Sequence, residues 1–445
     1  MRAEDLPVVA VKAIGARTKE VIEKDHAFVT QSYNRYYDIV LEEGKGALVR
    51  DVDGNTYLDF TGGGGTAALG HSHPRVAAAI KEQAEKMIHG LGMVFYSEPM
   101  VEVAERLARM THGPSEKRVY FGNSGAEANE CALKLARFHT KKPGIISFLG
   151  GFHGRTMATL SLNAVGSRMK QFFAPFLSEN VLAPYPYCYR CQINLTYPDC
   201  NIACVDYIQE WILNKIMPAE NTAAIIIEPI QGVSGFIVPP DGYFQKLYKL
   251  CRDNNILLIA DEVFSGMGRT GRFFAIEHWG VEADMMTTAK SIAGGVPLGV
   301  CVAKDEVMDW GKGLHATTFA GNNLACAASK AALDAVVEDK LMERAEHLGG
   351  GILARLQEMK QRYELVGDVR GKGLMAGLEF VKDREKKTPA PDEAAEIRKR
   401  CSQKGILFFA GGASGIRMCP PLVTTEEQIQ FALDGLEESI EECGK

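Results

Sequence analysis

The sequence predicts an α/β fold with a mainly parallel central sheet, helices on both faces of that sheet, and a smaller α+β domain beside it. Three short apolar runs support this prediction, at residues 145–148, 223–227 and 256–260. Each is typical of a strand that is buried on both faces. Helical patterns alternate with these runs, which indicates a parallel sheet built from strand–helix–strand units.

The order of these patterns divides the chain of 445 residues into two domains. We expect residues 1–61 to form an N-terminal segment of the small domain, residues 62–330 the large domain, and residues 331–445 the C-terminal part of the small domain. Between residues 47 and 60, two alternating runs flank an Asp-Gly-Asn sequence, which predicts a hairpin.

The composition excludes several classes of function. The chain has 46% hydrophobic and 24% charged residues, as an ordinary soluble globular protein does. Its net charge of −6 gives no basic surface for nucleic acid. No apolar run approaches the roughly 18 residues that a membrane span needs, and the first 20 residues lack the apolar core of a signal peptide. We therefore expect a cytoplasmic protein without a nucleic-acid or membrane partner.

Charged residues stand at the ends of the predicted strands. Asp261 follows the run 256–260, Lys290 follows the run 283–289, and Glu228 follows the run 223–227. Ligands of open α/β sheets bind at this edge, and a buried charge is costly unless it is paired. Pyridoxal phosphate needs such a pair, because a lysine amine binds it covalently and a carboxylate keeps its ring nitrogen protonated. Loop-capping roles for Asp261 and Lys290 remain the alternative.

A candidate phosphate site lies at residues 122–126. A strand is expected to stop at Gly122, and a helix begins near Ala126 after Ser124 and Gly125. Small residues at a helix start let backbone N–H groups approach an anion, and the helix dipole favours negative charge there. An ordinary Asn/Ser helix cap is the alternative. Beside Asp261 and Lys290, phosphate binding is the favoured interpretation.

Three motifs carry a resemblance to a known family. Residues 261–263 (Asp-Glu-Val), 266–271 (Gly-Met-Gly-Arg-Thr-Gly) and 289–295 (Ala-Lys-Ser-Ile-Ala-Gly-Gly) resemble the signature of the subgroup III aminotransferases, which are fold-type I pyridoxal-phosphate enzymes. The likeness is greatest to 4-aminobutyrate aminotransferases, with amino-acid racemases of the same fold next. It implies pyridoxal 5′-phosphate as cofactor, with Lys290 and Asp261 as the catalytic residues.

The resemblance also implies roles for residues around the cofactor. Phe152 is expected to stack on one face of the cofactor ring and Val263 to pack on the other, while His153 lies beside them. The threonine of a loop that crosses a dimer interface, here Thr318, is expected to donate to the phosphate held by the other subunit. A homodimer with two shared active sites is thereby implied.

Four further residues are implied in substrate binding. Arg155 is expected to bind the carboxylate of an ω-amino acid through its bidentate fork. Arg417 is expected to bind an α-carboxylate, and Glu228 to pair with Arg417 when no such carboxylate is present. Family members often carry a bulky residue where Gly64 stands, which implies a more open pocket wall here.

Together these residues imply transamination of an ω-amino acid, 4-aminobutyrate or a similar one, with 2-oxoglutarate, giving the semialdehyde and glutamate. The small-molecule partners would be an amino acid and a 2-oxo acid. A pyridoxal-phosphate-dependent racemase or epimerase of the same fold stays open, because it uses the same lysine, aspartate and phosphate site. Arg155, and Glu228 with Arg417, favour the transaminase.

A cysteine-rich loop departs most from the family. Cys188 and Cys191 are spaced as C-x2-C, and Cys200 and Cys204 as C-x3-C, which is a plausible spacing for a tetrahedral metal site. Partly buried free thiols or a disulfide are the alternatives. We expect no bound metal.

Overall fold

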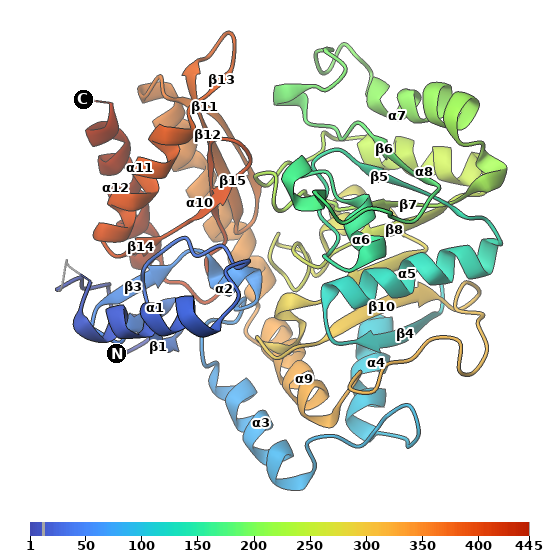
Figure 1. The fold of residues 1–445 in the computed structure, drawn as a ribbon, viewed down its shortest axis with the longest axis horizontal. Helices are drawn as coiled ribbons and strands as arrows, with labels where there is room; N and C mark the ends of the chain where they lie inside the picture. Colours follow the sequence, from blue (N-terminus) through green and yellow to red (C-terminus); the bar gives the residue numbers. More distant parts are fainter. Residues whose placement is uncertain (11–13, 445) are drawn as a thin grey trace.

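The computed structural model describes residues 1–10 and 14–444. Residues 11–13 of the expected N-terminal segment and residue 445 of the expected C-terminal part lie outside the described residues. Figure 1 shows the large central sheet on one side of the molecule and the N-terminal strands together with the C-terminal elements on the other.

Seven strands form the central sheet, in the order β4 (Lys117–Gly122), β10 (Gly299–Lys304), β9 (Met285–Thr288), β8 (Leu257–Asp261), β7 (Thr222–Ile227), β5 (Gly144–Phe148) and β6 (Asn180–Ala183). The strands from β9 to β6 pair in parallel, whereas β10 runs antiparallel to β4 and β9. The predicted α/β fold with a mainly parallel sheet is confirmed. The carboxyl ends of the parallel strands meet at one edge, where the predicted site residues follow them.

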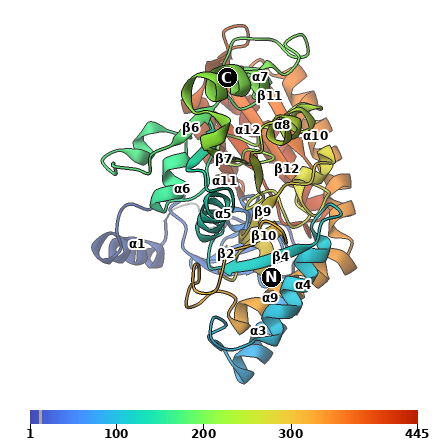
Figure 2. The same ribbon diagram turned by 90° about the vertical axis from the view of Figure 1, so that its right-hand side faces the viewer.

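Both faces of this sheet are buried, because successive side chains of its strands enter two different cores. Along β8, Ile259 packs in one core, and Leu258 and Ala260 pack in the other. Helix α5 (Gly125–Thr140) covers the first face, and α8 (Tyr243–Asp253) covers the second. Figure 2 views α5 nearly end-on, against the strands of the sheet. This alternation explains why the central strands read as continuous apolar runs.

The other helices of the large part surround this sheet. They are α3 (Pro74–Lys86), α4 (Glu98–Met110), α6 (Met157–Leu162), α7 (Ala203–Tyr207) with a π-helix at Ile208–Ile216, and α9 (Asn323–Glu338). The glycine run forms α2 (Gly62–Gly65), in which all four residues have positive φ. Glycine adopts this conformation without steric cost, so the run makes a tight turn and not an open linker.

Two smaller sheets make up the rest of the molecule. One has the order β1 (Leu41–Lys45), β2 (Leu48–Asp51), β3 (Thr56–Asp59) and β14 (Ile406–Leu407); the other has β11 (Val366–Lys372), β12 (Met375–Asp383), β16 (Gly415–Met418) and β15 (Phe409–Gly411), with β13 (Thr388–Pro389) beside β12. Their helices are α1 (Ala16–Phe28), α10 (Leu341–Arg362), α11 (Pro391–Gln403) and α12 (Glu426–Cys443). The predicted hairpin is β2–β3, and β14 pairs in parallel with β3.

The domain boundary expected after residue 330 falls inside the continuous helix α9. Helix α10 packs on β11 and β12 of the smaller part. We propose that the boundary lies in the short turn at residues 339–340, between α9 and α10. Within the described residues, no helix has both the length and the apolar character to cross a membrane.

Candidate active site

Asp261 lies at the end of β8 and is the centre of a buried hydrogen-bond network. Its Oδ2 accepts from Asn129 Nδ2 at 2.8 Å and from His153 Nδ1 at 2.8 Å, and its Oδ1 accepts from the backbone N–H of Val263 at 3.0 Å. Thr287 Oγ1, on neighbouring β9, donates to Asn129 Oδ1 at 2.6 Å. Three donors from separate elements therefore fix the position of this carboxylate.

His153 is fully enclosed beside Asp261. Burial alone would lower the pKa of His153, but the hydrogen bond to Asp261 and the negative charge of Asp261 outweigh burial and raise it. The backbone N–H of His153 donates to Asn163 Oδ1 at 2.7 Å, and its carbonyl accepts from Asn129. The imidazole is thus an anchored neighbour of Asp261.

Lys290 follows β9 after one intervening residue, Ala289, and adopts a positive φ of 45°. This conformation is uncommon for a side chain other than glycine and is often found at functional sites. Its Nζ lies 3.7 Å from the centre of the Phe264 ring. Burial lowers the pKa of Lys290 to about 8, although Glu228 and Asp261 act in the opposite direction. At pH 7 about a tenth of this amine is therefore uncharged.

The helix start beside Lys290 offers two free donors. Ser124 caps α5 by accepting from the backbone N–H of Glu127 at 3.2 Å. The N–H groups of Gly125 and Ala126 have no partner within the described residues. A Cβ at Gly125 would lie 2.7 Å from Val263 Cγ1, so only glycine permits this close approach. The arrangement leaves an anion-binding helix terminus facing the cavity.

These groups surround one cavity of about 400 Å³. Nine of the residues predicted from the sequence line it: Ser124, Gly125, Ala126, Phe152, His153, Glu228, Asp261, Val263 and Lys290. Asn129, Thr66, Gly232 and Phe264 also line it and were not among the predicted site residues. Asn129 could have been found as a polar residue on the buried face of the helix that the sequence predicts.

Glu228 and Arg417 lie near each other but do not form the expected ion pair. Glu228 accepts from the backbone N–H groups of Phe152 and Gly232, each at 2.8 Å. Arg417 donates to the carbonyls of Ala410, at 2.7 Å, and Gly232, at 3.0 Å. The two charges are therefore both bound to Gly232. Backbone partners satisfy each group, which is the physical reason why no direct pair is needed.

Burial also changes the protonation of this pair. It raises the pKa of Glu228 to about 7, although His153 and the two backbone donors favour the charged form. Burial lowers the pKa of the Arg417 guanidinium. The Phe236 and Phe409 rings lie 5.6 Å and 5.0 Å from that guanidinium. Glu228 can thus change its charge near neutral pH, whereas the Arg417 guanidinium lies beside the Phe236 and Phe409 rings.

Four predicted residues do not line this cavity: Arg417, described above, and Arg155, Thr318 and Gly64. Arg155 is exposed, makes no hydrogen bond or ion pair with any described residue, and has its guanidinium 5.8 Å from the Phe152 ring centre. Thr318 is exposed in its own chain. At Gly64, Phe409 Cζ lies 3.9 Å from the position that a Cβ would take. The Phe409 ring borders this space, and a pocket wall more open than in other family members stays a prediction.

The cysteine loop forms a separate cavity. Cys188, Cys191, Cys200 and Cys204 all line it and are all free thiols. Burial and neighbouring thiols raise the pKa of Cys204 to about 12. In the part of the chain that the structure describes, no three Cys, His, Asp or Glu side chains are placed to hold a metal ion. Absence of metal stays a prediction: elemental analysis of purified protein should find well under one equivalent of zinc or iron per chain.

The fold and site together define a class of protein, an enzyme with a lysine and an aspartate at adjacent strand ends of an α/β sheet. Residues 29–440 match the family model described as aminotransferase class-III. The chain is 39% identical over 427 residues to leucine/methionine racemase of Thermococcus litoralis, covering 95% of this chain and 96% of that protein. It is 37% identical over 419 residues to a probable 4-aminobutyrate aminotransferase of Bacillus subtilis, covering 93% and 96%.

A solved structure of a Bacillus anthracis aminotransferase superposes with a TM-score of 0.89 at 31% identity, covering 97% of this chain and all of that one. The chain therefore belongs to the class III aminotransferases, which are pyridoxal-phosphate-dependent enzymes.

The site residues fit this cofactor. The unpaired N–H groups at the start of α5 suit its phosphate, and the Phe152 and Val263 side chains offer apolar contacts to a flat ring. Asp261, held by three donors, suits a protonated ring nitrogen, and Lys290 suits the covalent link. Any side chain at position 125 would meet Val263 and fill the space beside the start of α5.

Proposed function

We propose that this enzyme transfers the amino group of an ω-amino acid, 4-aminobutyrate or a similar one, to 2-oxoglutarate, giving the semialdehyde and glutamate. The observation that carries the proposal is the shared attachment of Glu228 and Arg417 to Gly232. Two substrates with carboxylates at different distances from the reacting amine need a cation that can be exposed or neutralised. A buried carboxylate with a pKa near 7 beside Arg417 can supply that change.

The chain's own residues account for the proton transfers. When bound, pyridoxal phosphate would supply an electron sink for the negative charge left on the donor's carbon. Lys290 Nζ can accept the proton that the donor's carbon loses, because burial keeps a fraction of this amine uncharged. The Asp261 carboxylate would hold the cofactor's ring nitrogen in its protonated form. The apolar side chains of Phe152, Val263 and Phe264 limit access of water to the cavity.

Arg155 is the proposed partner of the ω-carboxylate. It follows the cavity residues Phe152 and His153 in the chain and has no competing partner among the described residues. All of its donors are therefore available to a substrate that reaches the mouth of the cavity. Thr318, exposed in its own chain, remains the proposed donor to the partner's phosphate site in a homodimer. We also propose a cytoplasmic location.

Single-turnover absorbance changes of the cofactor test whether Arg155 binds the ω-carboxylate and Arg417 the α-carboxylate. Arg155→Ala should slow the half-reaction with 4-aminobutyrate more than that with glutamate, and Arg417→Ala should do the reverse. Each lost charge-assisted pair should cost about 2–5 kcal/mol in the affected half-reaction only. Arg155→Lys and Arg417→Lys serve as matched controls that keep the charge but lose the fork. Equal damage to both half-reactions from both alanine variants would contradict the proposal.

A racemase or epimerase is the second candidate. It is favoured by the similarity to leucine/methionine racemase of Thermococcus litoralis. One carboxylate site, at Arg417, would suffice for it. A panel of amino donors with 2-oxoglutarate separates the two, because a transaminase forms glutamate whereas a racemase inverts the amino acid without forming glutamate.

A further inference from the structure

The turn at residues 232–235 joins the two parts of the molecule. It follows β7 and Glu228, and Ser234 Oγ donates to the carbonyl of Gly150 at 2.6 Å within the large part. From the small part, the backbone N–H of Gly412 donates to the carbonyl of Val233 at 3.3 Å. Elements of both parts therefore hold this turn.

Gly232, the first residue of the turn, is hydrogen-bonded to two charged side chains. The N–H of Gly232 is bound to Glu228 and its carbonyl is bound to Arg417. Because both bonds use the same residue, a displacement of the turn would move the Glu228 and Arg417 side chains relative to each other.

Arg370, on β11, is hydrogen-bonded to Gly235, the last residue of the turn. Its Nε donates to the carbonyl of Gly235 at 2.8 Å. Gly235 has φ of +111°, and a Cβ there would lie 2.7 Å from the Arg370 guanidinium, so only glycine allows this approach. Asp368 accepts from Arg370 Nη1 at 2.7 Å and Glu379 accepts from it at 3.1 Å. The guanidinium is thus held from behind by two carboxylates and presents its Nε to the turn.

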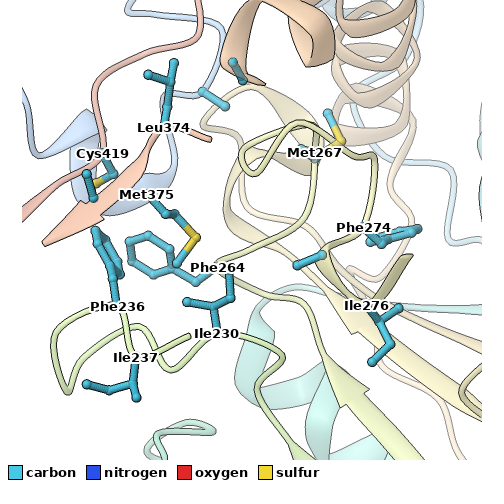
Figure 3. Packing of buried hydrophobic residues seen from close by; sticks show 14 of the residues in the cluster. Ile230, Phe236, Ile237, Phe264, Met267, Phe274, Ile276, Leu374, Met375 and Cys419 are labelled. Carbon is cyan, nitrogen blue, oxygen red and sulfur yellow. The ribbon is translucent and has the colours of Figure 1, made fainter. Parts of the chain in front are cut away.

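The chain after the turn is also constrained. Phe236 has φ of +57°, a costly conformation for an aromatic residue, which persists only when the surroundings impose it. Figure 3 shows Phe236 of this segment near Cys419 of the small part, and the Arg417 guanidinium lies 5.6 Å from the Phe236 ring centre. The small part therefore fixes the turn through packing as well as through Arg370.

We propose that Arg370 is a positioning residue: by holding the turn 232–235 it sets the placement of Arg417 and Glu228 for the α-carboxylate of the substrate. This inference rests on the proposed role of Arg417. Arg370 does not line the cavity, so its effect acts through the turn.

Arg370→Lys in the full-length holoenzyme tests the proposal. Lysine keeps the charge near Asp368 and Glu379, but its single nitrogen cannot also reproduce the Nε bond to Gly235. The KM for glutamate should rise about tenfold, as expected for loss of one hydrogen bond from a charged group, while kcat changes less than about threefold. The half-reaction with 4-aminobutyrate should be much less affected.

Arg384→Lys is the matched control. Arg384 also donates to backbone carbonyls of the small part, those of Tyr363 at 2.8 Å and Glu364 at 3.1 Å, but it does not bind the turn 232–235. It should leave the KM for glutamate within about twofold of wild type, although it loses a comparable bond. Equal KM changes in the two variants, or an unchanged KM in Arg370→Lys, would overturn the inference.

A second readout does not depend on the substrate. Hydrogen exchange of the peptide that contains the Gly232 amide should be faster in Arg370→Lys than in Arg384→Lys and wild type. If wild-type enzyme converts neither 4-aminobutyrate nor glutamate, the proposed function fails, and exchange alone decides whether Arg370 holds the turn. Unchanged exchange would overturn the inference in that case too.

Discussion

Two regions of the site hold their charges in different ways. The floor of the cavity consists of Asp261, Lys290 and the residues that bind Asp261. The substrate side consists of Glu228, Arg417 and the turn 232–235. At the floor, Asp261 accepts three hydrogen bonds from Asn129, His153 and Val263, all within the large part. On the substrate side, Arg417 of the small part is bound to two backbone carbonyls, one of them from a turn of the large part. The floor is therefore rigidly prearranged, whereas the substrate side depends on how the two parts meet.

This difference suits the two tasks. An electron sink works best when the charge that supports it does not move, since prearranged electrostatics require no rearrangement during the reaction. A site for two carboxylates needs the opposite property. Glu228, with a pKa near 7 and only backbone partners, can change its charge without breaking a side-chain network.

The largest effect is expected from Lys290→Ala at the floor. Loss of the amine should abolish turnover and the absorbance band of covalently bound cofactor, because no other lysine lines the cavity within the described residues. Absorbance spectra and turnover with a donor panel provide the measurement. A variant that retains both the band and near-normal turnover would refute the assignment of the whole site.

The next largest effect is expected from Asp261→Asn. An amide cannot keep the ring nitrogen of the cofactor protonated, so the variant should bind cofactor but lose several powers of ten in rate, on the order of 4 kcal/mol or more of barrier. The rate is measured under single-turnover conditions with saturating donor. A rate within about tenfold of wild type would place Asp261 away from the ring.

Asn129→Ala tests whether the rigidity of the floor matters in itself. The variant removes one donor to Asp261 and leaves Thr287 Oγ1 and the His153 carbonyl without this partner. A buried unsatisfied network of this kind should raise the barrier by about 2 kcal/mol and slow both half-reactions equally. Unequal slowing of the two half-reactions would contradict the claim that Asn129 acts only through Asp261, which both half-reactions use.

Most of the floor could be predicted from the sequence because its residues end strands, follow strands or begin a helix; Asn129, inside α5, is the exception. Asp261, Lys290 and Ser124 are such positions, and a parallel sheet brings them to one edge. The substrate side could not be placed in this way. Its bonds join Arg417 to Gly232 across 185 residues and Arg370 to Gly235 across 135 residues, and no local pattern specifies such contacts. The missing Glu228–Arg417 pair has the same origin, because backbone partners from a distant turn replaced it.

The last expected effect is on the free energy of unfolding, and it measures what burying Lys290 at the floor costs the folded protein. Burial lowers the pKa of Lys290 to about 8, from 10.5 in an unfolded chain. Between these values the unfolded chain binds more protons than the folded one, so the free energy of unfolding rises with pH. At pH 7 the buried ammonium therefore destabilises the folded protein when no cofactor is bound.

Lys290→Met should stabilise the cofactor-free protein by on the order of 3 kcal/mol at pH 7, and this gain should shrink as the pH rises from 8 to 10.5. Lys304→Met is the control with the opposite sign. Burial would lower the pKa of Lys304, but Asp284, whose carboxylate lies 3.1 Å away, and Glu282 outweigh burial and raise it. Removing Lys304 should therefore destabilise the protein by leaving Asp284 with fewer partners. Urea unfolding of the cofactor-free proteins at pH 7, 8, 9 and 10 measures both effects. If the difference between Lys290→Met and wild type stays constant over this range, Lys290 is charged in the folded protein and the floor carries no such cost.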